Sequence, residues 1–182
     1  MGQPARVPVS IQKMLNCTVA ACVTTAGKLH MRSYFGGFTG DTIVEFVREA
    51  CAVWEQRADA QVRSAGCIVI LDNCPSHSRD VVARAFASPH SHKFLPAYSP
   101  QLNIIENVFC MHKSHIRALH SRHRAEVIAI DTAPRGERTR MRKAFLERFC
   151  VEGWAEIQDS AVANTWGAHH RIYPACLGRQ NI

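Results

Sequence analysis

Two acidic residues stand where a carboxylate could take part in metal-dependent chemistry, and Asp72 is the first of them. It directly follows the apolar run at residues 67–71, which is too short for a helix and is typical of a strand covered on both faces. Active sites of α/β proteins gather at the carboxyl edge of the sheet, so an acid at this point is a candidate catalytic residue. A helix cap or an Asx turn leading into Asn73 is the simpler alternative.

The second acid, Glu106, stands near the start of a predicted helix. At ~100° per residue, Lys113 and Arg117 lie within ~20° of Glu106 around the helix, a path suited to a phosphate backbone. An exposed face of helical salt bridges is the alternative. Glu106 lies at the border of a predicted apolar stripe that covers one face of the helix and is formed by Ile105, Val108, Phe109, His112, Ile116 and Leu119.

The histidines and cysteines form no metal-binding motif in the sequence. His112 falls on the apolar stripe, and His77 and His115 lack a paired carboxylate at ligand spacing, so we interpret all three as structural. The eight cysteines include no C-x-x-C pair, which argues against a zinc knuckle and a thioredoxin-type motif. Reduced, mostly buried thiols in an intracellular compartment are the favoured interpretation, and a structural metal is the less favoured one.

Strands and helices alternate in the pattern, which predicts an α/β layer architecture. A hairpin is expected over residues 16–25 and 29–35, and a helix over 42–57 with Asp41 as its N-cap. Further along, the pattern predicts a short helix at 78–87, a strand at 93–95, a helix from about 103, a helical stripe at 141–149, a helical segment at 154–162 and an irregular tail.

Length, composition and charge limit the classes of function that the chain can have. The 182 residues suit one domain, and 47% of them are hydrophobic, which excludes extensive disorder. No apolar run suggests a membrane span or a secretory signal. Residues 111–148 carry ten Lys and Arg against four Asp and Glu, whereas the rest of the chain carries twelve against eleven. Such clustering is the footprint expected for a polyanion partner such as DNA, and a solvated helical surface is the equally weighted alternative. The candidate DNA contacts are Lys113, Arg117, Arg122, Arg124, Arg138, Arg140, Arg142 and Lys143.

The phrases LDNCPSHS and FLPAYSPQLNIIENVF resemble the catalytic core of mariner-like DNA transposases, members of the DDE superfamily of endonucleases. The resemblance runs from about residue 2 to 117. It implies an RNase H-like fold, with a mixed sheet flanked by helices, and DNA cleavage and strand transfer with Mg²⁺ or Mn²⁺. It makes Asp72 and Glu106 the second and third catalytic acids and metal ligands. It also implies a nuclear or otherwise intracellular protein that is not secreted, and leaves a homodimer open.

The family's first catalytic acid, on the first central strand, has no counterpart here. The opening MGQPARV resembles the segment that follows that strand, so we expect an N-terminally truncated core at residues 1–123 and a helical C-terminal extension at 124–182. Asp41 cannot substitute, because it precedes the helix after the hairpin. Ala97, Gln101 and Ile104 also depart from the family's pattern. We therefore expect no cleavage by this chain; a non-catalytic nucleic-acid-binding module or a transposon remnant without function are the alternatives.

Overall fold

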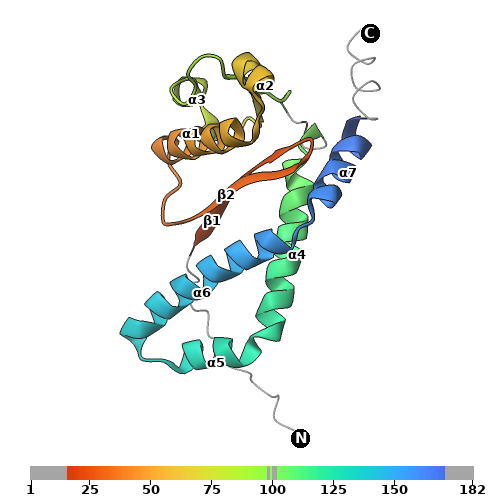
Figure 1. Cartoon of the computed structure of the whole chain (residues 1–182). Helices are drawn as coiled ribbons and strands as arrows, with labels where there is room; N and C mark the ends of the chain where they lie inside the picture. Colours follow the sequence, from red (N-terminus) through yellow and green to blue (C-terminus); the bar gives the residue numbers. More distant parts are fainter. Residues whose placement is uncertain (1–15, 98, 100–101, 171–182) are drawn as a thin grey trace, which may run out of the picture.

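The hairpin predicted near the start of the chain is present. A computed structural model describes residues 16–97, 99 and 102–170 (Figure 1). Strands β1 (Cys17–Thr24) and β2 (Gly27–Phe35) pair antiparallel, from Cys17 opposite Phe35 to Thr24 opposite Gly27. Gly27 has a φ of +143°, a conformation that L side chains rarely adopt, at the point where the turn enters β2.

A second pair of strands is parallel. Strand β3 (Ile68–Leu71) pairs with β4 (Ser91–Phe94), so the described strands form two separate pairs instead of one mixed sheet. The mixed α/β class is confirmed. The expectation that β3 is covered on both faces is wrong: Ile68 and Ile70 are 58% and 50% exposed, because no described side chain covers that face.

Helix α1 (Gly40–Arg57) packs against both strand pairs and forms the first hydrophobic core. Its buried side chains, among them Phe46 and Cys51, contact Ala20 and Tyr34 of the hairpin and Val69 of β3. Short helices α2 (Ala60–Ala65), η1 (Pro75–His77) and α3 (Arg79–Ala83) complete this half of the fold.

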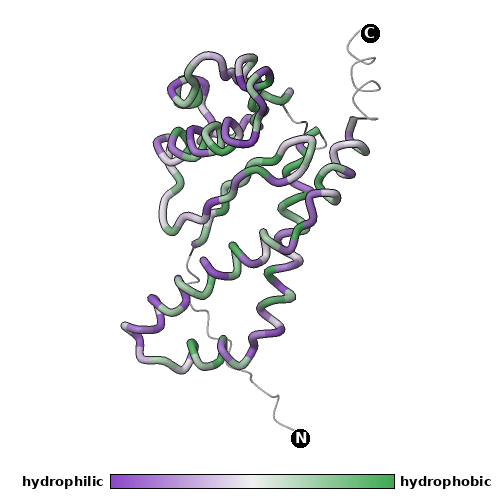
Figure 2. The backbone as a smooth tube through the Cα atoms, in the orientation of Figure 1, coloured by the Kyte–Doolittle hydropathy of each residue, from purple (hydrophilic) through white to green (hydrophobic). Residues whose placement is uncertain are grey.

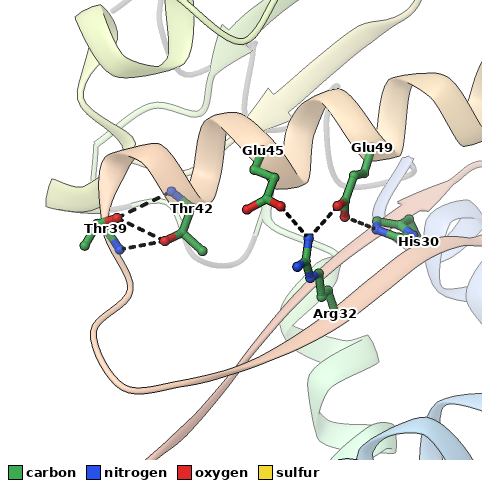
Figure 3. A network of polar contacts seen from close by, with 6 residues as sticks. All are labelled: His30, Arg32, Thr39, Thr42, Glu45 and Glu49. Carbon is green, nitrogen blue, oxygen red and sulfur yellow. Dashed lines mark hydrogen bonds and ion pairs between the residues drawn. The ribbon is translucent and has the colours of Figure 1, made fainter.

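The N-cap of α1 is Thr39, whose hydroxyl accepts from the Thr42 backbone N–H in a capping box (Figure 3). The prediction of Asp41 as the cap is therefore wrong. The helix begins earlier than expected, which places Asp41 within the first turn, where a carboxylate complements the helix dipole. Asp41 instead pairs with Nη2 of Arg84 at 3.1 Å.

A polar network joins the side of α1 nearest the hairpin to strand β2 (Figure 3). Nε2 of His30 lies 3.1 Å from Oε2 of Glu49. The guanidinium of Arg32 donates to Glu45 at 3.0 Å and also contacts Glu49. Two residues of β2 therefore fix the position of α1 over the hairpin through charged partners.

Four helices make up the C-terminal part of the described chain: α4 (Ile105–Arg122), α5 (Arg124–Thr132), α6 (Arg135–Glu156) and α7 (Asp159–His170). The helices predicted from about 103 and around 141–149 are confirmed. The prediction of one continuous helical segment at 154–162 is wrong, because α6 ends at Glu156 and a new helix begins at Asp159. The Asp159 carboxylate accepts a hydrogen bond from the Lys28 backbone N–H at 2.8 Å. The predicted tail lies outside the described residues.

Two cores hold these helices. One fills the space between α4, α5 and α6 with Leu119, Ile130, Phe145 and Phe149. The other joins Val23 of β1 to Val108, Ile157 and Val162. The C-terminal helices therefore pack on the hairpin, and the division at residue 123 stays a prediction. None of the helices in the described ranges is long and apolar enough to cross a membrane.

Candidate functional site

Asp72 leaves the end of β3 with its carboxylate partly exposed. Its Oδ1 accepts from the backbone N–H of Cys74 at 3.1 Å, which is the Asx turn considered from the sequence. The loop is anchored to β4 because Nδ2 of Asn73 donates to the Leu95 carbonyl at 2.6 Å. The Asx turn and a catalytic role are compatible, because the turn engages only one of the two carboxylate oxygens.

His77 is the closest partner of Asp72 in this loop. Its Nδ1 lies 2.7 Å from Oδ1 of Asp72, with side-chain exposures of 22% for His77 and 42% for Asp72. This contact was not predicted, because the sequence shows no carboxylate at ligand spacing from His77. The available signal was Pro75, which starts a single 3₁₀ turn and so returns His77 toward Asp72. The imidazole orients one acid of the candidate site.

Glu106 is the second residue of α4 and is exposed. Its backbone N–H donates to the Asn103 carbonyl at 3.2 Å, and its carboxylate makes no hydrogen bond or ion pair within residues 16–97, 99 and 102–170. The predicted apolar stripe of α4 is confirmed, with Val108 fully buried and His112 only 2% exposed. Packing thus directs Glu106 to solvent.

No described hydrogen bond or ion pair joins Asp72 to Glu106, and part of the intervening loop lies outside the described residues. That the two acids share one cleft therefore stays a prediction. Both present carboxylate oxygens, the ligands that hard divalent ions take. Neither acid is committed to a salt bridge with Lys or Arg among the residues the structure describes, so both carboxylates are chemically suited to hold such an ion.

The two other histidines weighed as ligands have structural contacts. Nε2 of buried His112 lies 2.8 Å from the Cys150 carbonyl, and burial lowers the pKa of His112. Nδ1 of His115 lies 2.9 Å from Oε2 of Glu156. Both contacts join α4 to α6, which agrees with the structural interpretation.

The eight candidate DNA contacts divide into two groups. Four of them are engaged within the fold: Arg138 donates to the Ala133 carbonyl, Arg142 pairs with Asp131 at 2.6 Å, Arg122 lies 3.7 Å from Glu156, and Lys143 lies over the Phe35 ring.

The other four are exposed and have no ion pair with described residues. They are Lys113, Arg117, Arg124 and Arg140. Figure 2 shows hydrophilic segments recurring along α4 and α6, the helices that carry three of these cations. Sequence position alone could not separate the two groups, because three of the four partners, Glu156, Asp131 and Phe35, come from other helices or strands.

A family model described as DDE superfamily endonuclease matches residues 1–128. The match includes both candidate acids and most of α5. The chain therefore belongs to the DDE superfamily of endonucleases, a class that acts on DNA and generally uses divalent metal ions. No curated protein matches the sequence.

Proposed function

We propose that this chain contributes two of the three metal-binding acids of a mariner-like DNA transposase, and that it does not cleave DNA without a third. The observation that carries the proposal is the placement of Asp72 directly after β3 and of Glu106 in the first turn of α4, both inside the matched segment. The first acid in the whole sequence is Asp41, and it is engaged with Arg84 at the start of α1.

We infer further that the two strand pairs belong to one RNase H-like mixed sheet. Three observations support this: one pair is antiparallel, the other is parallel, and α1 packs against both. A strand inserted between β1 and β3 would join the pairs, and it would supply the third acid. The exposed Ile68 and Ile70 on β3 form an apolar face of the kind that helices cover in a larger sheet.

Asp72 and Glu106 would hold a Mg²⁺ or Mn²⁺ ion through carboxylate oxygens. Such ions activate the attacking water or 3′-hydroxyl and stabilise the leaving oxygen in phosphodiester cleavage. His77 would keep the Asp72 carboxylate oriented through Oδ1. Lys113 and Arg117, on the same face of α4 as Glu106, would bind the DNA backbone beside the acids.

A non-catalytic nucleic-acid-binding module is the second candidate. It is favoured by the exposed cations on α4, α5 and α6. It differs from the first candidate in one measurable property, because it needs no metal ion at Asp72 and Glu106.

Manganese binding and plasmid nicking test the proposal together. Mn²⁺ binding to the full chain, followed by electron paramagnetic resonance, should weaken in Asp72→Asn and Glu106→Gln but not in the exposed-acid controls Asp80→Asn and Glu137→Gln. Supercoiled plasmid should stay intact with the chain alone and be nicked when an upstream strand carrying an Asp is added.

Two results would count against the proposal. Equal Mn²⁺ affinity in all five proteins would remove the two acids from the site and favour the binding module. Nicking by the unextended chain that disappears in Asp72→Asn would show that another group of this chain supplies the third ligand.

A further inference from the structure

We propose that Cys51, Cys67 and His90 form a Zn²⁺ site at the end of β3 opposite to Asp72. The three side chains come from α1, from the residue before β3 and from the residue before β4. Their donor atoms, two Sγ and one imidazole nitrogen, all lie within 4.8 Å of one another. In a tetrahedral zinc site, with bonds of about 2.3 Å to sulfur and about 2.0 Å to nitrogen, the donor atoms are separated by about 3.5–3.8 Å.

The parallel strand pair fixes two of the donors beside each other. Ile68 pairs with Ser91, so Cys67 and His90 are the adjacent residues one step earlier. The Ser91 backbone N–H donates to the Cys67 carbonyl at 3.0 Å, and Sγ of Cys67 lies 3.2 Å from Nδ1 of His90. The Cys67 backbone N–H also donates to Nδ1 at 3.2 Å, a long hydrogen bond that a metal on this nitrogen would replace.

Glu55 sets the imidazole of His90 in the tautomer that metal binding needs. Its Oε1 lies 2.8 Å from Nε2 of His90, and the His90 side chain is only 7% exposed. Nε2 therefore donates to the carboxylate, which leaves the Nδ1 lone pair directed at the thiols. The ring of Trp54 contacts His90 edge-on, with centroids 5.7 Å apart. A carboxylate behind a metal-binding imidazole is the common outer-shell arrangement of zinc sites.

The donor set and the burial select the ion. Thiolates favour zinc or copper(I) over the hard ions that carboxylates bind, and two thiolates balance the charge of Zn²⁺ in a site where Cys51 is 7% exposed. Burial raises the pKa of Cys51 to about 12, so metal binding would release protons from the site. Cys22 of β1 packs against the same core as Cys51 and Cys67, which makes it a candidate for a fourth ligand.

The site would join α1 to the strand that carries Asp72. At about 3.3 Å per residue, the five residues from Cys67 to Asp72 separate the zinc site from the candidate catalytic acid by roughly 16 Å. The two sites also differ in ligand chemistry, so a zinc site can exist whether or not Asp72 and Glu106 bind Mg²⁺. Its role would be structural, because a sheet of two short strands has little core of its own.

Cobalt substitution of the full chain under reducing conditions tests the site. We expect one tightly bound Co²⁺ at the thiol site of each chain, with the visible bands of tetrahedral coordination and a thiolate-to-cobalt charge-transfer band, and displacement of this Co²⁺ by one equivalent of Zn²⁺. Cys51→Ser and Cys67→Ser should each lower the Zn²⁺ affinity at least a hundredfold. The matched control, Cys110→Ser, removes an exposed thiol on α4 and should change neither the spectrum nor the affinity.

Glu55→Gln keeps all three ligands and tests the positioning role separately. It should weaken Zn²⁺ binding about 10–100-fold and leave the charge-transfer band in place. Circular dichroism of each metal-free variant identifies any that fail to fold, and Glu55→Gln then carries the test. An octahedral Co²⁺ spectrum without thiolate bands, or Zn²⁺ affinity equal in Glu55→Gln and the wild type, would overturn the proposal.

Discussion

Replacing Lys113 and Arg117 with glutamine should make DNA binding by this protein less sensitive to salt. Both side chains are exposed on the face of α4 that starts with Glu106, and neither has an ion pair among the described residues. Each cation that neutralises a phosphate contributes a slope of about −0.9 to the logarithm of affinity against the logarithm of salt. The double variant should therefore flatten the slope by about 1.8. Between 50 and 200 mM NaCl, its affinity should fall about twelvefold less than that of the wild type.

Fluorescence anisotropy of a labelled duplex over this salt range gives the slope directly. The matched control is Arg48→Gln with Arg63→Gln, which removes the same net charge from α1 and α2, where both guanidinium groups donate to backbone carbonyls at 2.8 Å. Its slope should equal that of the wild type. Arg142→Gln should flatten the slope by less than the roughly 0.9 expected for one phosphate contact, because Asp131 already pairs with Arg142. Equal flattening in both double variants would show that net charge, and not this face of α4, determines DNA binding.

Two further changes test the crossing of α4 and α6. Because burial lowers the pKa of His112 from 6.5, the unfolded chain takes up a proton before the folded one does as the pH falls. The free energy of unfolding should therefore drop by up to about 1.4 kcal/mol per pH unit as the pH falls below 6.5. In urea denaturation, His112→Gln should lack this pH-dependent loss of stability. Identical pH profiles for the variant and the wild type would contradict the prediction. Gly153→Val should lower the free energy of unfolding by about 1–3 kcal/mol in the same assay, because a Cβ at this position would lie 3.0 Å from Cγ1 of Ile116. The control Gly136→Val lies on the same helix with open space around it, and it should leave the stability nearly unchanged.

Local patterns predicted most of the elements correctly. The hairpin, α1 and α4 follow from alternation, turn glycines and helical spacing, which depend only on residues close in the chain. The positions of Asp72 at a strand end and Glu106 in a first helical turn are local in the same sense. The choice between Thr39 and Asp41 as N-cap was missed because it depends on where the first turn starts, and the sequence offers polar candidates at both positions.

Contacts between segments that are distant in the chain could not be predicted from the sequence patterns. The pairing of Arg142 with Asp131, and the exposure of Arg140 close by, depend on how α5 packs against α6. Likewise, the exposed face of β3 reflects which elements lie beside it, whereas its apolar composition predicted burial.

The sequence by itself determined the family, the two candidate acids and the basic character of residues 111–148, because each is carried by residue types at short spacing. Only the tertiary structure decided which cations are exposed and which are engaged with described residues, and only it brought Cys51, Cys67 and His90 together. These three residues come from segments with no ligand-type spacing between them. The pairing of β3 with β4 and the packing of α1 against them bring their donor atoms within 4.8 Å of one another, and that arrangement exists only in the folded chain.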